Sequence, residues 1–334
     1  AGGGGKGMRL VWKEEELKNA WDSARTESKA AFGNDSMYME KFIEDPRHIE
    51  IQIIGDKTGK ACHLSERDCS IQRRHQKLAE ETPSPFMTDK LREEMGTAAI
   101  KAAEAVKYEG VGTVEFLVDK YRKFYFMEMN TRIQVEHPVT ESITNSDLVE
   151  MQIKFALGID LDLTEQNKIN RNGHAVECRL YAEDPSKNFL PSPGKITKLK
   201  IPNIGLTNIR LDIGVDEGDE ISFYYDPMIA KIISKSENRT ESINNMINFL
   251  KDFEIEGIKT NKSFLISVLQ NKTFEDADFN TKFIENNLTL LTKKKEIKLK
   301  DKQQNKNDEQ KYSDKDVKAF EKIISKTPKI KNGQ

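Results

Sequence analysis

Helical spacing of apolar residues predicts three helices in the first half of the chain. They cover residues 13–32, residues 88–107 and residues 146–158. In the first stretch Leu17, Trp21 and Ala24 recur at helical spacing, which predicts an amphipathic helix. Thr88 lies near the start of the second stretch, and Gly158 closes the third. These positions set the expected helix ends.

A period of two predicts strands between and after these helices. Ile49, Ile51 and Ile53 alternate with polar residues, which predicts a half-buried strand that ends in a turn at Gly55. Residues 60–70 are the expected hairpin partner of that strand. Further strands are predicted at residues 37–44, residues 111–119 and residues 123–130, the last two joined by a polar turn.

The second half has a different pattern, because a polar stretch at residues 163–173 separates it from the first and suggests a domain boundary. Short strands are expected there at residues 174–182, 194–202, 207–214 and 221–234, and helices at residues 239–252 and 260–270. From about Leu291 the chain is too polar to bury a core, so residues 290–334 are expected to form a disordered or weakly helical Lys-rich tail.

Composition narrows the function classes. The 334 residues suffice for two or more domains, and the formal charge of -2 argues against a nucleic-acid binder, which normally carries a basic excess. The three cysteines lack metal-site spacing and favour a reduced cytoplasmic or organellar matrix compartment. No apolar run approaches the roughly 18 residues that a membrane span needs.

Two glutamates on neighbouring predicted strands are the first candidate site. Glu115 and Glu128 each lie among apolar residues, and Asn130 projects to the same side as Glu128 because strand side chains alternate. Two carboxylates and an amide oxygen form a hard-oxygen set suited to magnesium that bridges nucleotide phosphates. The alternative interpretation is a pair of carboxylates at solvated strand positions.

The segment from Asn130 to Glu141 carries a second candidate set. Arg132 can grip a small planar oxyanion, Glu136 is a candidate general base, and Val135 can offer a backbone N–H. Gln134 and His137 lie in the same segment. A surface loop is the competing interpretation.

Three other features have both a functional and a structural interpretation. Residues 65–77 end in Arg73, Arg74, His75 and Lys77, which are candidate anion ligands or a basic solvated turn. His48 is a candidate nucleotide contact or an edge-strand histidine. Cys62 and Cys69 are expected to be structural, and Lys231 an exposed strand residue.

The first nine residues, AGGGGKGMR, form a Gly-rich loop without a P-loop pattern. Its backbone N–H groups can approach phosphate oxygens closely, and Lys6 and Arg9 add positive charge. A flexible linker is the alternative.

Several of these motifs together resemble the biotin carboxylases, which are ATP-grasp components of acyl-CoA and pyruvate carboxylases. The motifs are AGGGGKGMR, EKFIEDPRHIEIQ, ERDCSIQRRHQK, GTVEFL, EMNTRIQVEHPVTE, GHAVECRLYAEDP and FLPSPGKIT. The resemblance covers about residues 1–285. ERDCSIQRRHQK and EMNTRIQVEHPVTE are the most specific, because other ATP-grasp enzymes share only the glutamate–asparagine arrangement.

The resemblance implies an α+β fold. It assigns residues 1–45 to the Gly-rich lid part of an ATP-grasp domain, residues 46–165 to its core, and residues 170–285 to a biotin carboxylase C-terminal domain. The Rossmann-like N-terminal domain that the family places first is absent from this sequence, so the isolated chain is expected to be impaired.

The resemblance also assigns roles to individual residues. It implies that Mg²⁺ or Mn²⁺, as two ions, binds Glu115, Glu128 and Asn130. It implies ATP contacts at Gly4, Gly5, Glu40, Lys41, Phe42, Ile43, His48, Gln72, His75, Glu115 and Glu128. It places bicarbonate at Lys77, Arg132, Gln134 and Val135. Glu136 is the implied base that deprotonates bicarbonate, and Arg179 stabilises the biotin enolate.

The implied reaction carboxylates biotin through carboxyphosphate, formed from ATP and bicarbonate. The sequence lacks a biotinylation motif, so biotin is expected on a separate carrier protein or domain. A carboxyltransferase subunit and a homo-oligomeric intact enzyme are also implied. The motifs VDEGDEISFYYDPMIAKI and FEIEGIKTNKSFL favour an acyl-CoA carboxylase α chain. The alternatives are another ATP-grasp ligase and a non-catalytic interaction module.

Overall fold

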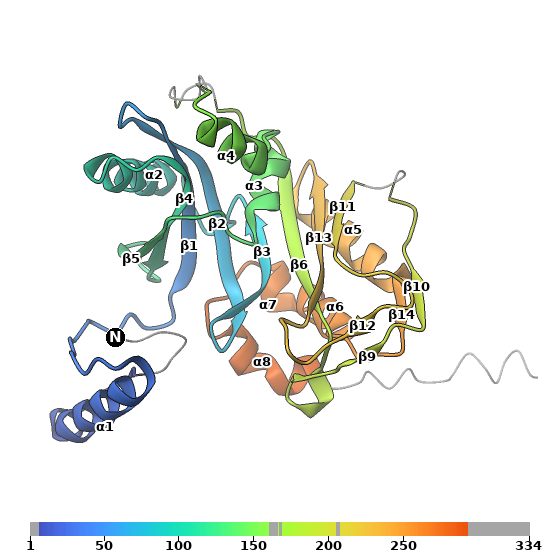
Figure 1. The fold of residues 1–334 in the computed structure, drawn as a ribbon, viewed down its shortest axis with the longest axis horizontal. Coiled ribbons are helices and arrows are strands. Elements are labelled where there is room, and N and C mark those ends of the chain that lie inside the picture. The colour runs from blue at the N-terminus through green and yellow to red at the C-terminus, as the bar shows by residue number, and fades with distance from the viewer. Residues whose placement is uncertain (1–6, 160–165, 167–168, 205–207, 293–334) are drawn as a thin grey trace, which may run out of the picture. The chain divides into compact units, whose positions relative to one another are not determined.

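A computed structural model describes residues 7–159, 166, 169–204 and 208–292 of the chain (Figure 1). Gly4 and Gly5 of the predicted lid loop lie outside the described residues, as does the predicted tail from Lys293 onward. The described residues end in helix α8, Phe283–Thr292.

An eight-stranded antiparallel sheet forms the centre of the fold, in the order β11-β13-β6-β3-β2-β1-β4-β5 (Figure 1). Its strands are β1 (Arg47–Gly55), β2 (Ala61–Arg73), β3 (Gln76–Thr82), β4 (Gly110–Val118), β5 (Phe124–Asn130), β6 (His174–Tyr181), β11 (Ile209–Ile213) and β13 (Met228–Ser236). Because β3 pairs directly with β6, one sheet contains strands from both sides of the polar stretch at residues 163–173.

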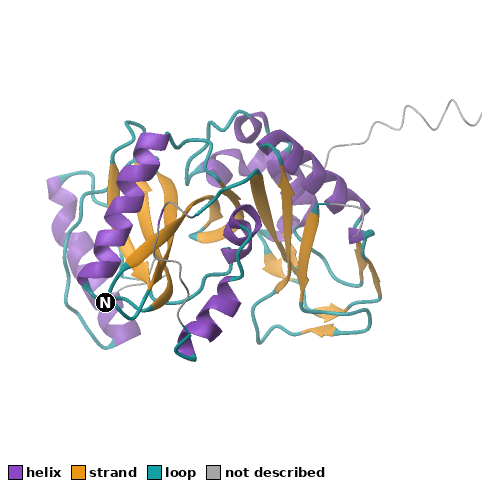
Figure 2. Cartoon of the chain, turned by 90° about the horizontal axis from the view of Figure 1, so that it is seen from above, coloured by secondary structure: helices purple, strands orange, loops and turns teal. Residues whose placement is uncertain are grey.

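Most of the helices pack on the sheet, and short strands complete the second half (Figure 2). The helices are α1 (Glu14–Phe32), α2 (Asp89–Ala105), α3 (His137–Thr144), α4 (Leu148–Ala156), α5 (Arg239–Asp252), α6 (Lys262–Leu269), α7 (Lys272–Glu275) and α8, with the 3₁₀ turn η2 (Pro185–Lys187). The short strands are β7 (Glu183–Asp184), β8 (Leu190–Pro191), β9 (Gly194–Lys195), β10 (Lys198–Lys200), β12 (Glu220–Ile221) and β14 (Glu254–Glu256). None of the described helices is long and apolar enough to cross a membrane.

The strongly periodic stretches fold as the sequence predicts. Helices α1, α2, α4, α5 and α6 form within two residues of their expected limits, and the Thr88 side chain caps α2 by accepting from the N–H of Leu91. The strand predicted at residues 37–44 is wrong, because this described segment has no regular structure. Most of its residues are exposed, so no neighbouring strand offers the hydrogen bonds that a strand needs.

Strand β1 has two different faces, and both are buried. Ile49, Ile51 and Ile53 pack with α2 in one hydrophobic cluster. Glu50 and Gln52 alternate with them and therefore face the other side, yet each is fully buried. The expectation of a half-buried strand is wrong, because polar partners from β2, β4 and the region around α3 cover this second face.

Two β-bulges turn side chains toward this polar face. The register of β2 and β3 steps from Ile71↔Ala79 to Gln72↔Lys77, which leaves Leu78 as the extra residue of β3. Lys77 and Glu80, three residues apart, can therefore share one face. A similar step in β4 and β5 leaves Met127 as an extra residue, so that Glu128 lies directly opposite Glu115.

A larger hydrophobic cluster packs behind the second half of the sheet. It joins β6 and β13 to α5, α6 and α8 through residues such as Cys178, Ile232, Met246 and Leu265. Asn261, which is fully buried, accepts from the N–H of Tyr181 and donates to the carbonyl of Arg179. These bonds tie the start of α6 to the part of β6 that carries Arg179.

Candidate active site

The polar face of the sheet gathers around the ammonium group of Lys77. Its Nζ donates to Glu50 Oε2 at 2.6 Å, to Glu115 Oε1 at 3.2 Å and to Glu136 Oε1. Burial alone would lower the pKa of Lys77, but the surrounding acidic groups raise it well above its usual value. Lys77 is therefore a fixed positive charge, held by three carboxylates from three different segments.

Arg67 is the second cation of the face and is fully buried. Its guanidinium donates to Glu50 and to four neutral acceptors, Gln52, Thr113, Gln134 and Thr140. Burial would raise the pKa of Glu50, but the charges of Arg67 and Lys77 lower it to about 2. Glu50 is therefore ionised at neutral pH, and Arg67 connects β1, β2 and β4 with α3.

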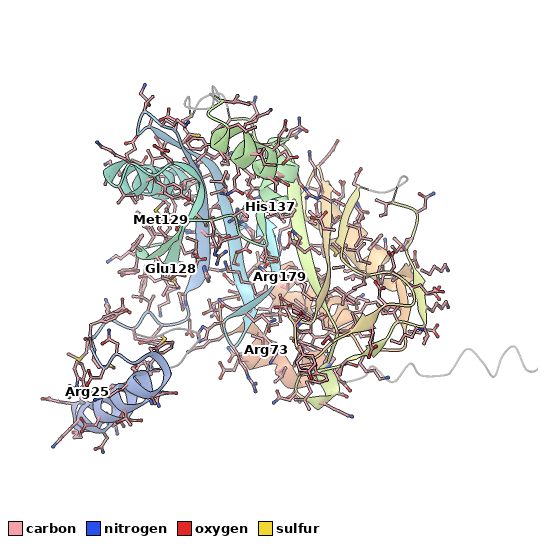
Figure 3. All side chains as sticks on the ribbon, viewed as in Figure 1. Arg25, Arg73, Glu128, Met129, His137 and Arg179 are labelled. Atoms are coloured by element: carbon pink, nitrogen blue, oxygen red, sulfur yellow. The ribbon has the colours of Figure 1, made fainter. Side chains whose placement is uncertain are left out.

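Glu136 lies between cations from two different strands. It immediately precedes α3 and is 2% exposed. Its Oε1 accepts from Lys77 on β3, and its Oε2 accepts from Arg179 Nη2 on β6 at 2.8 Å. Figure 3 shows Arg179 on β6 and His137, the residue after Glu136, at the start of α3. The pairing of β3 with β6 holds these two cations at a fixed spacing.

Arg179 also contacts an acidic group on β3. Its Nε donates to Glu80 Oε1 at 2.7 Å, and its Nη2 lies 2.6 Å from the same oxygen. Burial would lower the pKa of Arg179, but Glu80, Glu136 and Glu177 raise it above its usual value. The guanidinium is thus fixed between Glu80 and Glu136.

The carboxylate of Glu115 makes hydrogen bonds with four residues. Its Oε2 lies 3.0 Å from His48 Nε2, and its Oε1 accepts from Lys77, from Gln134 Nε2 at 2.7 Å and from Asn130 Nδ2 at 3.1 Å. Burial would raise the pKa of Glu115, but these partners lower it strongly. The carboxylate therefore stays ionised, as a metal ligand must be.

The residues predicted to bind metal share one face of the sheet. Glu115 and Glu128 are direct partners in the β4–β5 pairing, and Thr113 is paired with Asn130. Glu128 is exposed and has no hydrogen bond or ion pair among the described residues, so its oxygens are free for a cation. Two carboxylates and an amide oxygen fit Mg²⁺ or Mn²⁺, which prefer oxygen ligands.

A second acidic group has metal-like spacing but a different explanation. His48, Glu50 and Glu115 bring ligand atoms within 4.8 Å of one another. Arg67 and Lys77 already donate to this group, so two cations compensate its charge from inside the sheet. We therefore assign Glu50, which both cations contact, to the ion-pair network, and Glu115 stays among the predicted metal ligands.

Other predicted residues lie nearer the surface. Arg132 is exposed and donates to the carbonyl of Ile133 and to Asn130 Oδ1. His75 is exposed in the β2–β3 turn, while Gln72 on β2 is buried. In the predicted adenine segment Glu40, Lys41 and Phe42 are exposed and Ile43 is buried.

Two expectations need correction. Lys231 is not an exposed strand residue: its Nζ donates to the carbonyl of Val135 at 3.0 Å and lies 3.4 Å from Asp212. One of the two interpretations of residues 65–77 is that they end in a basic solvated turn. In the structure β2 continues to Arg73 and β3 starts at Gln76. Only Arg74 and His75 form the turn, which leaves Lys77 free to enter the site.

Sequence reasoning missed Glu50, Arg67 and Glu80 as site residues. A charged residue in a strand is normally read as solvent-facing, and these three are fully or almost fully buried. One signal was available: Glu50 and Gln52 alternate with the apolar Ile49, Ile51 and Ile53, so they share one face. Nothing local to the sequence indicates that this face is buried.

Comparison with known proteins identifies the family. Residues 1–164 match the family described as "Carbamoyl-phosphate synthase L chain, ATP binding domain", and residues 177–286 match "Biotin carboxylase C-terminal domain". Biotin carboxylase 1 of Bacillus subtilis is 53% identical over 286 residues, which are 85% of this chain and 63% of that protein. The chain belongs to the biotin carboxylase family. This membership confirms the resemblance and the fold expected from the sequence motifs.

Other biotin carboxylase relatives agree in sequence and structure. The propionyl-CoA carboxylase alpha chain of Sus scrofa is 50% identical over 85% of this chain and 39% of its own length. The crystal structure of the Campylobacter jejuni biotin carboxylase in complex with β-γ-ATP has a TM-score of 0.81 and 48% identity, and the match covers 85% of this chain and 63% of that one. The biotin carboxylase domain of Hydrogenobacter thermophilus 2-oxoglutarate carboxylase, with MgADP, ADP and bicarbonate, has a TM-score of 0.82 and 44% identity over 88% of this chain and 64% of that one. The chain thus spans less than two thirds of the length of these relatives.

Proposed function

We propose that this chain catalyses the ATP- and bicarbonate-dependent carboxylation of biotin, with carboxyphosphate as the intermediate. The observation that supports it most is the position of Glu136, which Lys77 contacts from β3 and Arg179 contacts from β6. One acidic group thereby lies between a cation suited to bicarbonate and a cation suited to the oxygen of a biotin enolate.

In this proposal the bicarbonate ligands are Lys77, Arg132, Gln134 and Val135. Lys77 and Arg132 supply positive charge, and the amide of Gln134 is already oriented by hydrogen bonds to Arg67 and Glu115. Glu136 takes the proton of bicarbonate. Removing that proton makes the bicarbonate oxygen a better nucleophile toward the γ-phosphate of ATP.

The nucleotide lies toward β5 in this proposal. Glu115, Glu128 and Asn130 hold Mg²⁺ or Mn²⁺ as two ions, which neutralise phosphate charge when bound. The further nucleotide contacts are Gly4, Gly5, Glu40, Lys41, Phe42, Ile43, His48, Gln72 and His75. His48 also orients Glu115 directly, through the contact of 3.0 Å.

Both oxygens of Glu136 accept hydrogen bonds in the structure. Lys77 bonds one oxygen and Arg179 the other. We infer that bicarbonate takes over the bond from Lys77, and that biotin takes over the bond from Arg179. Glu136 then exchanges its two cationic partners for substrate groups, which places its carboxylate beside the proton of bicarbonate.

We propose the same domain division as the sequence suggests: residues 1–45 as the lid part, residues 46–165 as the ATP-grasp core, and residues 170–285 as the C-terminal domain. Biotin arrives on a carrier protein or domain, and a carboxyltransferase subunit uses the product. The intact enzyme is proposed to be a homo-oligomeric acyl-CoA carboxylase component, cytoplasmic in a bacterium or in the mitochondrial matrix of a eukaryote.

The test measures bicarbonate-dependent release of ADP by the intact protein that carries this chain, with and without free biotin. We expect biotin to stimulate the release. We expect Glu136→Gln to lower it by about 10²–10⁴-fold, the usual contribution of a general base. Glu81→Gln is the matched control, because Glu81 is also a buried, ion-paired glutamate but bonds His174 and Arg239 instead of the site.

A second ATP-grasp activity is the alternative, favoured by the carbamoyl-phosphate synthase description of the first matched family. The same assay separates the two functions when ammonia replaces biotin. Stimulation by ammonia and not by biotin would support the alternative and refute the proposed function.

A further inference from the structure

Two buried glutamates face each other behind Arg179. Glu80 on β3 and Glu177 on β6 are direct partners in the strand pairing. Directly opposite residues of an antiparallel pair project from the same face, with Cβ atoms about 4.5–5.5 Å apart. Glu80 is 1% exposed and Glu177 is fully buried. Their carboxyl groups are therefore within reach of each other, away from solvent.

The hydrogen bonds of this pair are incomplete. Glu80 Oε1 accepts from Arg179, but Glu80 Oε2 and both oxygens of Glu177 have no hydrogen-bond partner among the described residues. An ionised carboxylate can only accept hydrogen bonds, so two ionised neighbours cannot satisfy each other. One proton placed between them supplies the missing donor and removes one buried charge.

The surrounding charges indicate which residue keeps the proton. Arg179 bonds Glu80 directly, so the negative charge is compensated there. Glu177 has no ion pair among the described residues. Burial and the charge of Glu80 raise its pKa well above its usual value, although Lys231 on β13 and Arg179 oppose the rise. Burial raises the pKa of Glu80 only to about 7, because Arg179 opposes the rise. The proton therefore belongs mainly to Glu177.

We propose that Glu80 and Glu177 share one proton and together fix the guanidinium of Arg179 against Glu136, which makes Glu80 a positioning residue of the site. The kinetic consequence rests on the proposed function, whereas the shared proton depends on the fold alone.

The geometry explains how the shared proton positions Arg179. Arg179 Nη2 lies 2.6 Å from Glu80 Oε1 and 2.8 Å from Glu136 Oε2, so one nitrogen connects the two glutamates. Protonated Glu177 donates to Glu80 Oε2 and leaves Oε1 for Arg179. If Glu177 were ionised, its repulsion would push the Glu80 carboxylate away from this position and the guanidinium would follow.

The first experiment detects the proton directly, as the infrared C=O band of a protonated carboxylic acid in the protein at neutral pH. We expect the band in the wild type and its loss in Glu177→Gln, whose amide keeps a donor in place and preserves the fold. In Glu80→Gln the band should remain but shift, because the partner of the acid has changed. A wild-type spectrum without the band, or a band unchanged in both variants, would overturn the shared proton.

The second experiment measures the positioning role through steady-state kinetics of biotin-stimulated ADP release. We expect Glu80→Gln to lower kcat about 10- to 100-fold, the loss that follows removal of a charged hydrogen bond. The KM for MgATP should stay within about twofold, because Arg179 does not belong to the nucleotide site. Glu177→Gln should lower kcat less, since its amide still donates to Glu80.

The control for the kinetics is Glu81→Gln, on the same strand and the opposite face. It breaks a buried ion pair with Arg239 and His174, so it should lower stability without the fall in kcat. An equal fall in kcat for Glu80→Gln and Glu81→Gln would reduce the role of Glu80 to folding and overturn the positioning role. If biotin does not stimulate the wild type, the proposed function fails, and the infrared comparison still decides the shared proton.

Discussion

Replacing Arg67 with methionine tests whether the buried ion-pair network holds the site together. Methionine fills a similar volume but donates no hydrogen bond. The change leaves Glu50 with Lys77 as its remaining cation, and it removes the donor that Gln52, Thr113, Gln134 and Thr140 share. All of these groups except Lys77 belong to the fully buried or nearly buried part of the polar face.

Two estimates of the cost agree. The pKa of Glu50 falls from 4.5 to about 2, which corresponds to about 3 kcal/mol of stabilisation of its charge. Arg67 and Lys77 share that stabilisation, but the loss of Arg67 also leaves neutral acceptors unpaired, at about 1 kcal/mol each before relaxation. Breaking a buried ion pair by removing one partner costs about 3–5 kcal/mol in other proteins. We therefore expect Arg67→Met to lower the free energy of unfolding by about 3–5 kcal/mol.

The assay is urea unfolding at pH 7 of the wild type, Arg67→Met, Glu50→Gln and the double variant. We expect the double variant to lose about 1–3 kcal/mol less free energy of unfolding than the two single variants lose together, because it leaves no uncompensated charge. Arg67→Lys serves as the control for charge alone, since one ammonium group cannot reach acceptors on two strands, a loop and a helix.

The pH dependence of stability is a second check on the contribution of ionised Glu50. The folded-state pKa of Glu50 lies below the unfolded value, so its contribution is present above about pH 4.5 and is lost as the pH falls toward about 2. The stability difference between the wild type and Arg67→Met should therefore shrink below about pH 4.5. A cost under about 1 kcal/mol at pH 7, or a double variant no more stable than the summed losses, would refute the assigned role of Arg67.

Three further predictions concern single positions. Glu128→Gln should weaken MgADP binding at least about tenfold in calorimetry while changing stability by less than about 0.5 kcal/mol, because the side chain is exposed; unchanged binding would contradict its metal role. Asn261→Ala should cost about 2–3 kcal/mol in urea unfolding, since two buried backbone groups of β6 lose their partner, and a cost near zero would show that they pair elsewhere. Lys231→Met should raise the KM for bicarbonate, because it releases the carbonyl of Val135. Lys231→Arg should return this KM to the wild-type value. Equal KM values in both variants would argue against a link between Lys231 and bicarbonate binding.

Local periodicity predicted the elements whose apolar residues all lie on one face. The helix at residues 88–107 and the strand around Ile51 were predictable because their apolar residues repeat at the period of their own structure. Strand β3 was not, since its sequence starts directly after the basic run that ends at His75. Its pairing with β6, nearly a hundred residues later, depends on tertiary contacts that no local pattern reports.

The site was predictable in part, for a related reason. The sequence placed Glu115 and Glu128 on neighbouring strands, and the strand pairing puts them directly opposite each other. It did not include Glu50, Arg67 or Glu80, because charged residues in strands usually face water. Their burial depends on compensation by partners from other strands, and those partners are known only when the strands are assembled.

The position of the proposed chemistry on one continuous sheet limits how the site can move. Lys77 and Glu80 lie on β3, Arg179 lies on β6, and backbone hydrogen bonds join the two strands. Separating Lys77 from Arg179 would therefore break sheet pairing, which is costly in a buried sheet. Glu136 lies outside the strands, just before α3, and makes side-chain bonds to both cations. Substrate binding can thus rearrange the side-chain bonds of Glu136 while the spacing of the two cations stays fixed, as a site for two successive reaction steps requires.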